Sequence, residues 1–328
     1  MSQILDIAFW TFVGVEAGIF TIFALGLQLQ FGFTGLLNFG NVAFMAIAAY
    51  TMAILVVKAT MPLWQASLIA IGAAMLFAVI IGIPTLRLRT DYLAITTIAF
   101  SEIIRYVALN QSNLTGGPQG TINLSGGATV SLYNTSWQAF QKHVQHGLAH
   151  IFGQHLTRDP NFTMLILIWV VAVLIILLLR SVVRSPWGRV LRSIREDEDA
   201  AAAVGKNVFW YKLQSLTIGA AIGAIAGLFF AFQFSFFSPP DFAPLTTFFA
   251  YVIVILGGTT STWGVPVGAI IFGVIFAGTR FFTFPPFSFL TSGDRAYVRL
   301  IIIGLILIGL MAFRPQGLFG KREEMILE

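Results

Sequence analysis

Long apolar stretches dominate the pattern of this chain. Four of them, residues 17–57, 59–86, 213–240 and 242–279, contain no Asp, Glu, Lys or Arg. A helix needs about 20 apolar residues to cross a bilayer. Every backbone N–H and C=O inside lipid must be paired internally, which makes helices the default. The strands of a membrane β-barrel would alternate polar and apolar residues, and these stretches do not. The pattern therefore predicts an all-α fold, a polytopic transmembrane helical bundle.

The apolar stretches predict about nine spans. They cover roughly residues 7–29, 36–57, 63–86, 91–109, 162–182, 214–237, 244–258, 264–284 and 297–313. A polar, glycine-rich patch at residues 30–41 separates the first two spans. It is either a tight loop or a broken helix that lines a cavity, because non-helical backbone at membrane depth is tolerated only against protein or water.

Basic residues next to the spans predict the orientation. They follow the third span, surround the loop after the fifth and follow the ninth, as Arg87, Arg89, Arg180, Arg184, Arg189, Arg192, Arg195, Lys206, Lys212, Arg314, Lys321 and Arg322. All three groups fall on one side if the N-terminus is outside and the C-terminus is cytoplasmic, as the positive-inside rule requires. Residues 1–328 then form one transmembrane domain, with an extracytoplasmic segment at 110–161 and a cytoplasmic loop at 183–213.

The amino-acid composition limits the kinds of chemical activity that the chain can be expected to have. The chain is 57% hydrophobic and 10% charged, against about 25% charged in ordinary domains. It has no cysteine and no G-x-x-x-x-G-K-[ST] loop, so thiolate chemistry and ATP hydrolysis by the chain itself are not expected. The net charge of +5 comes from Lys and Arg clustered beside spans, which indicates membrane topology rather than nucleic-acid binding.

Four histidines, His143, His146, His150 and His155, occur in the outer segment. The first three share a helical face, but a zinc site needs a complete ligand set with an orienting shell around it. A solvated amphipathic segment is favoured over a metal site.

The loop at 183–213 carries the strongest functional signal. Residues 196–199 put negative charge at the start of an alanine run, where a helix dipole favours it. Gly205 then suits a position of positive φ after the helix. One interpretation is a short helix that contacts a partner; the other is a solvated loop whose basic residues only fix topology.

The spacing Asp199-Ala200-Ala201-x-x-x-Gly205 resembles the Glu-Ala-Ala-x-x-x-Gly signature of bacterial ABC importer permeases, with Asp in place of Glu. In that family the loop forms a coupling helix that docks into a groove on the ATPase. The resemblance implies ATPase-coupling roles for Arg195, Glu196, Asp197, Glu198, Asp199, Ala200, Ala201 and Gly205.

Further motifs are similar to the LivM-type permease of branched-chain amino acid ABC importers. They lie at residues 89–95, 115–120, 188–198, 256–264 and 313–318, and the resemblance covers about residues 30–320. Thr260 stands where the family usually has Gly, and Pro266 comes one position late, which leaves the fine geometry of that loop open.

The resemblance implies a permease subunit that moves branched-chain or neutral amino acids across the bacterial inner membrane by ATP-driven alternating access. The expected partners are a second, LivH-type permease, two ATPase subunits, a periplasmic binding protein and membrane lipid. No nucleic acid, metal or cofactor of its own is expected, since ATP is bound by the ATPases. Sparse polar groups on apolar helices are the candidate substrate path: Asn38, Asn41, Thr96, Thr97 and Ser101.

Two alternatives stay open. Related permeases carry urea or short amides. An ion-coupled secondary transporter would need a coupling-ion site, for which Glu16 and the 30–41 patch are the available support. A membrane-embedded enzyme lacks any nucleophile–base or metal constellation.

Two charges lie inside the fourth predicted span. Glu102 and Arg105 are three residues apart, so they can pair on one helix face. We interpret them as a structural ion pair, or as an element of the path or of a subunit interface.

Overall fold

The structure, a computed structural model, describes residues 7–124, 132–152, 160–234, 236–278, 292–314 and 316–320. All regular elements in these residues are helical, so the all-α class is confirmed. In chain order they are α1 (Ile7–Thr34), α2 (Val42–Lys58), α3 (Leu63–Thr85), α4 (Thr90–Asn110), α5 (Ser112–Thr115), η2 (Gly117–Gln119), α6 (Thr121–Leu124), α7 (Leu132–Phe152), α9 (Pro160–Arg184), α10 (Pro186–Glu196), α11 (Glu198–Ala203), α12 (Val208–Gln233), η3 (Pro239–Phe242), α13 (Leu245–Gly257), α14 (Gly264–Gly278) and α15 (Ser292–Phe313).

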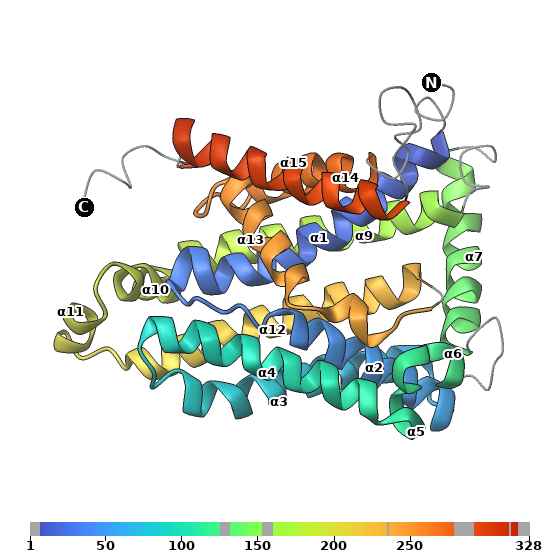
Figure 1. Ribbon diagram of the computed structural model, residues 1–328, viewed down its shortest axis with the longest axis horizontal. Helices are drawn as coiled ribbons and strands as arrows, with labels where there is room; N and C mark the ends of the chain where they lie inside the picture. Colours follow the sequence, from blue (N-terminus) through green and yellow to red (C-terminus); the bar gives the residue numbers. More distant parts are fainter. Residues whose placement is uncertain are drawn as a thin grey trace.

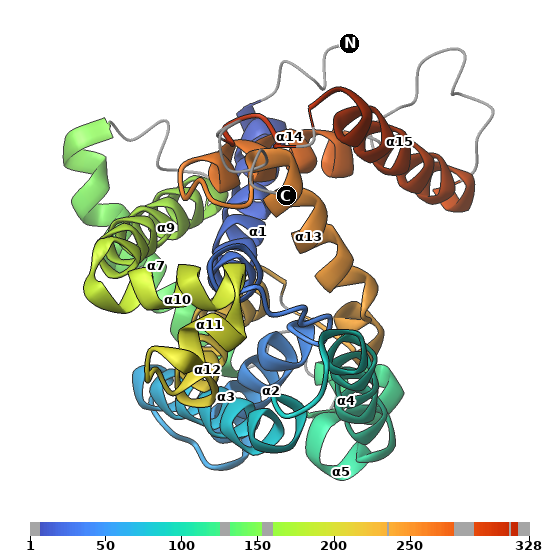
Figure 2. The same ribbon diagram turned by 90° about the vertical axis from the view of Figure 1, so that its left-hand side faces the viewer.

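Helix α1 is the centre of the bundle. It contacts α9, α12, α13 and α14, and Figures 1 and 2 show it running through the middle of the molecule. Residues 21–30 are buried without exception. A helix that is apolar all round must be covered on all sides, and α1 carries one charge, Glu16, in its 28 residues.

Helix α3 has one face packed in the bundle and one apolar face exposed on the outside of the bundle. Four of its alanines recur every four residues and are fully buried, at Ala66, Ala70, Ala74 and Ala78. This small-residue stripe allows close packing against α2 and α12. Large apolar side chains cover the opposite face and are exposed, among them Leu68, Leu76 and Ile80. Such a surface suits lipid rather than water.

Each of the nine predicted spans overlaps an apolar helix, and residues 279–284 of the eighth lie outside the described residues. Among the described residues, five helices are long and apolar enough to cross a membrane, on α1, α3, α4, α9 and α12. The apolar parts of α2, α13, α14 and α15 are shorter. A count of about nine spans therefore stays a prediction.

The predicted inner loop and outer segment lie at opposite ends of the long axis (Figure 1). Helices α10 and α11 project at one end, called here the α10–α11 end, and α7 stands at the other, called the α7 end. Helix α7 is attached by Trp137, whose ring stacks on Phe232 of α12 with centroids 4.3 Å apart. Which end faces the cytoplasm stays a prediction.

Residues 30–41 are a helix end followed by a buried, non-helical connection. Helix α1 continues to Thr34, Gly35 has a φ of +74°, and α2 begins at Val42. Asn38 and Asn41 are 2% and 0% exposed. The backbone between the helices is therefore held against protein, as the membrane environment demands.

Candidate functional site

Helix α10 is amphipathic and lies against the bundle. Gly188, Leu191 and Ile194 share its buried face, while Arg189 and Arg192 are exposed. Trp187 donates a hydrogen bond from Nε1 to Oε1 of Gln214 on α12, at 2.7 Å. These contacts fix the orientation of α10 and of the short helix that follows it.

Helix α11 is closed by local contacts at both ends. The side chain of Asp197 accepts hydrogen bonds from the backbone N–H groups of Asp199 and Ala200, both at 2.9 Å, as an N-cap does. Gly205 has a φ of +79° and donates from its N–H to the carbonyl of Ala202 at 2.9 Å. The predicted alanine helix and the positive φ at Gly205 are confirmed.

The tip of α11 offers a small surface of mixed character. Ala201 is buried at 3% exposure, but Ala200, Ala202, Ala203 and Val204 are exposed, Val204 by 73%. Glu196, Asp197 and Asp199 are exposed around them, and Glu198 pairs with Lys212 on α12. The tip of α11 therefore presents Val204 and three alanines to the outside, next to exposed carboxylates.

Arg195 connects α10 to the central helix. Its Nη1 donates to the carbonyl oxygen of Gly32 at 2.6 Å, near the last turn of α1. That turn leaves carbonyls without partners inside the helix, and a cation there is favoured by the helix dipole. The coupling-loop candidate is therefore joined directly to the helix that precedes the buried connection.

Two motifs that are distant in sequence meet beside this contact. The last two residues of α13, just before the turn to α14, accept two backbone hydrogen bonds from residues 318–319: Leu318 N–H to Leu256 O at 2.9 Å, and Phe319 N–H to Gly257 O at 3.2 Å. Gln28 of α1 donates from Nε2 to the carbonyl of Thr259 at 3.1 Å. The end of α1 thus touches the α13–α14 turn as well as α10.

A network of side-chain amides holds the buried connection. Gln30 is at its centre: Nδ2 of Asn38 donates to Oε1 of Gln30 at 2.8 Å, and Nε2 of Gln30 donates to Oδ1 of Asn41 at 3.3 Å. Oδ1 of Asn38 accepts from the N–H of Gly40 at 2.9 Å. The N–H of Val42 donates to Oγ1 of Thr247 on α13 at 3.1 Å. Because leaving a buried amide group without a partner is costly, these hydrogen bonds favour this path for residues 35–41, although Nδ2 of Asn41 has no partner among the described residues.

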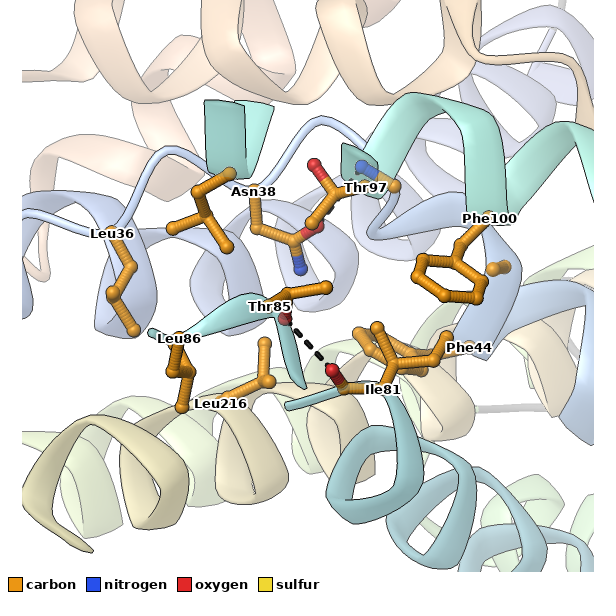
Figure 3. A pocket seen from close by; sticks show the side chains of 12 residues that line it. Leu36, Asn38, Phe44, Ile81, Thr85, Leu86, Thr97, Phe100 and Leu216 are labelled. Atoms are coloured by element: carbon orange, nitrogen blue, oxygen red, sulfur yellow. Dashed lines mark hydrogen bonds between the residues drawn. The ribbon is translucent and has the colours of Figure 1, made fainter. Parts of the chain in front are cut away.

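Asn38 and Thr97 line a narrow cleft between the connection, α3 and α4, drawn in Figure 3. Oγ1 of Thr97 accepts from the N–H of Phe39 at 3.1 Å, and Oγ1 of Thr85 donates to the carbonyl of Ile81 one turn earlier on α3, at 2.8 Å. Phe44 and other apolar side chains form the remaining wall. The cleft volume is about 10 Å³, close to that of one water molecule.

The structure therefore brings together three of the five path candidates. Asn38 and Asn41 are part of the buried connection and share Gln30 as a hydrogen-bond partner, and Thr97 of α4 contacts the connection at Phe39. The other two candidates do not take part in this network. Thr96 is half-buried, and its hydroxyl donates to the carbonyl of Tyr92 on α4. Ser101 is buried, and its hydroxyl donates to the carbonyl of Ile98 on the same helix.

Sequence reasoning missed two hydroxyls at this site, Thr247 on α13 and Ser215 on α12. Oγ of Ser215 lies 2.6 Å from Oγ1 of Thr34, at the end of α1. A single hydroxyl in a long apolar helix carries no pattern that separates it from the many others. Gln30 belonged to the polar patch already recognised at residues 30–41, so its signal was present.

The Glu102–Arg105 pair forms as the spacing predicts. Nη2 of Arg105 lies 2.6 Å from Oε2 of Glu102, and Nε reaches both carboxylate oxygens at 3.0 and 3.1 Å. The side chains of Arg105 and Glu102 are 20% and 28% exposed, so the pair lies on the surface of α4 rather than in the bundle interior. Its role as a path or interface element stays a prediction.

The described residues contain no group of three or more His, Cys, Asp or Glu side chains placed to hold a metal ion. His143 and His146 are exposed on α7, and His150 is on the same helix. His155 lies outside the described residues.

A bundle of apolar helices with a buried polar break, and with an amphipathic helix at one end, is typical of a multi-pass membrane protein. The family model "Branched-chain amino acid transport system / permease component" matches residues 10–311, and the chain belongs to that family.

Curated relatives agree with the family. The chain is 34% identical over 307 residues to the high-affinity branched-chain amino acid transport system permease protein LivM of Escherichia coli, covering 92% of this chain and 67% of the relative. It is 23% identical over 340 residues to a probable LivM of Methanocaldococcus jannaschii, covering 93% and 91%. It is 24% identical over 326 residues to E. coli LivH, covering 95% of each chain. No solved structure matched the chain.

Proposed function

We propose that this chain is a permease subunit of a binding-protein-dependent ABC importer that moves branched-chain and other neutral amino acids across the inner membrane of a bacterium. The family match over residues 10–311 is the observation that carries the proposal. Similarity to both LivM and LivH supports a LivH-type permease as its partner in the membrane.

The α10–α11 end is the surface for an ATPase subunit. The exposed tip of α11, Ala200 to Val204, enters a groove on the ATPase, and the surrounding carboxylates contact its basic groups. Two ATPases close on each other when ATP binds, and a periplasmic binding protein delivers the ligand to the opposite face. Nucleotide then shifts the population between two conformations of the permease pair.

The contact between Arg195 and Gly32 provides the route for coupling. Movement of α10 is transmitted to the end of α1 through the 2.6 Å hydrogen bond and the packing of α10 on α1. The end of α1 leads directly into the connection held by Gln30, Asn38 and Asn41. The state described here has the cleft at Asn38 and Thr97 nearly closed, and a rotation of α1 relative to α4 opens it.

In this scheme Asn38, Asn41, Thr96, Thr97 and Ser101 lie on or near the substrate path. The N-terminus faces the periplasm and the α10–α11 end faces the cytoplasm. The basic residues on α9, α10 and α12 support this orientation, because Arg and Lys are retained on the cytoplasmic side.

Reconstitution tests the function. The chain is purified with its second permease and two ATPases, placed in liposomes and supplied with liganded binding protein. Uptake of labelled leucine should require ATP and should persist after ionophores collapse the proton and sodium gradients. The chain alone should hydrolyse no ATP.

Each other outcome has a distinct meaning. Uptake that collapses with an ion gradient contradicts the ABC mechanism and favours the secondary transporter. ATP-driven uptake of urea or a short amide, without uptake of leucine, retains the class and overturns the substrate.

A further inference from the structure

Helix α4 suits contact with lipid less well than the other long apolar helices of the described residues. Of the five that are long and apolar enough to cross a membrane, it has the lowest mean hydropathy and also the smallest buried fraction. Lipid offers no hydrogen-bond partners, so the helix that is least covered by the bundle should be the most apolar of the set. The composition of α4 therefore indicates that something other than lipid covers it.

The exposed side chains of α4 share one face, called here the outer face of α4. They recur three or four residues apart, as positions on one side of a helix do. The exposed or half-buried residues of this face are Tyr92, Ile95, Ala99, Glu102, Ile103 and Tyr106. Leu93, Thr97 and Ser101 are buried on the opposite face, which packs on the bundle.

The outer face of α4 differs from the exposed face of α3. Residues 63–85 of α3 include no Asp, Glu, Lys or Arg, and Leu76 in the middle of that helix is 62% exposed. On α4, Glu102 lies eight residues before the helix end, about 12 Å along the axis, and pairs with Arg105. The two charges compensate each other, yet the side chains of Arg105 and Glu102 keep 20% and 28% of their surface exposed. Charged side chains within a membrane face protein or a water-filled cavity, so the pair requires a cover that lies inside the membrane and is partly polar.

Two further features of the outer face fit contact with protein. The guanidinium carbon of Arg105 lies 4.7 Å from the ring centroid of Tyr106, and Arg and Tyr are residue types that contribute most to the stability of protein interfaces. Ala99 lies at the centre of the face between Ile95 and Ile103, and a small side chain in such a place lets a neighbouring helix approach closely.

We propose that the outer face of α4 is the docking surface for the second permease subunit, whose helix packs over Ala99 and whose polar groups meet Glu102 and Arg105. The inference rests on the proposed function and adds the surface through which the two permeases join. In that scheme the binding protein and the ATPases lie outside the membrane, so they cannot cover the middle of a span. E. coli LivH is similar to this chain over 95% of each chain, so the second permease is expected to have an equivalent of α4. Two similar chains commonly pair through equivalent surfaces.

A partner on the outer face lies one helix away from the cleft at Asn38 and Thr97. Thr97 is on the buried face of α4 and contacts the connection at Phe39. The docked subunit therefore holds α4 in place, and opening of the cleft moves α1 relative to a fixed α4.

Photocrosslinking tests the surface with little change to the protein. In one variant, Ile103→p-benzoylphenylalanine places the probe on the outer face of α4. The matched control is Leu76→p-benzoylphenylalanine on α3, since both residues are the fourteenth of their helix and are 53% and 62% exposed. Irradiation of the complex in liposomes should link position 103 to the second permease, identified by mass spectrometry, and should give only lipid adducts at position 76.

A second test measures association of the two permeases. Ala99→Leu adds bulk at the centre of the outer face and should lower the association constant about tenfold, because an overpacked contact cannot close. Gly72→Leu on α3 is the control, since Gly72 is exposed and a Cβ added there meets no atom within 4 Å. Association is measured as the amount of second permease that stays with the tagged chain across a dilution series in detergent, normalised to the tagged chain present in the membrane.

The other outcomes separate the docking surface from the proposed function. Equal association of the two leucine variants, or no crosslink from position 103 in a complex that contains the second permease and takes up leucine, overturns the surface and leaves the function standing. A crosslink from position 103 to another copy of this chain overturns the choice of partner. A crosslink to the second permease in a complex that does not transport leucine retains the surface and contradicts the proposed function.

Discussion

At the scale of single residues, Gly205 is constrained by backbone conformation and not by space. Its φ is +79°, and a Cβ at this position would meet no atom within 4 Å. Substitution therefore acts through the left-handed backbone, at a cost of about 1–2 kcal/mol for a residue with a Cβ.

Gly205→Val should uncouple ATP hydrolysis from uptake, because the turn after α11 must leave its present conformation. Gly205→Asn is the matched control, since Asn tolerates the left-handed region and should keep most of the uptake. Leucine uptake and ATP hydrolysis are measured in liposomes with equal amounts of complex. Equal uptake by the Val and Asn variants would show that this turn does not position the docking surface.

The Glu102–Arg105 pair should behave as a unit. Removing one partner leaves a lone charge on an apolar helix, so Glu102→Gln and Arg105→Gln should each reduce complex stability more than the double variant does. A double-mutant cycle on the thermal stability of the complex measures the coupling, expected at about 0.5–3 kcal/mol. Additive losses would mean that the two side chains act separately.

Sequence reasoning succeeds at these residues because their signals are local. Gly205 follows an alanine run, and residues 102 and 105 have helical spacing. It fails at Thr247 and Ser215, whose partners Val42 and Thr34 are far away in sequence. Asn38 and Asn41 lie between these cases: their polarity in an apolar region was visible, but the role of Gln30 as their common partner depends on the fold.

At the scale of elements, α10 is the link between the predicted docking surface and the bundle. Arg195→Ala removes the hydrogen bond to Gly32 and should lower uptake per ATP hydrolysed by about tenfold, because charge-assisted hydrogen bonds of this kind contribute about 1.5–3 kcal/mol. Arg189→Ala, on the exposed face of the same helix, removes the same charge and should have little effect. Equal losses in both variants would assign the effect to net charge instead of the contact.

The apolar pattern located every long helix of the described residues except α7, because those helices are buried or face lipid. The polar helix α7 was expected only as an outer segment, since its sequence lacks a long apolar run. The alanine stripe of α3 defines which of its faces is inward, but the helices that cover it, α2 and α12, are known only from the fold.

At the scale of the whole molecule, the two ends of the bundle should differ in access. His146→Cys on α7 and Ser193→Cys on α10 place exposed thiols at opposite ends. An impermeant thiol reagent applied to cells with a permeable outer membrane should modify position 146 and reach position 193 only after the inner membrane is opened. The reverse pattern would invert the proposed orientation.

The hydrogen bond from Val42 to Thr247 ties the first turn of α2 to the first turn of α13. Helix α1 has 28 residues and is about 42 Å long, while α13 has 13 residues and is about 20 Å long, against a hydrocarbon thickness of about 30 Å. In a thicker bilayer α1, which is longer than the hydrocarbon layer, can adjust by changing its tilt. Helix α13 is already shorter than that layer, so a change of tilt cannot compensate for a thicker one. If the tied pair keeps a fixed depth while α1 tilts, acyl-chain length would act on the same connection as nucleotide in the proposed mechanism, and we expect the transport rate to depend on lipid thickness.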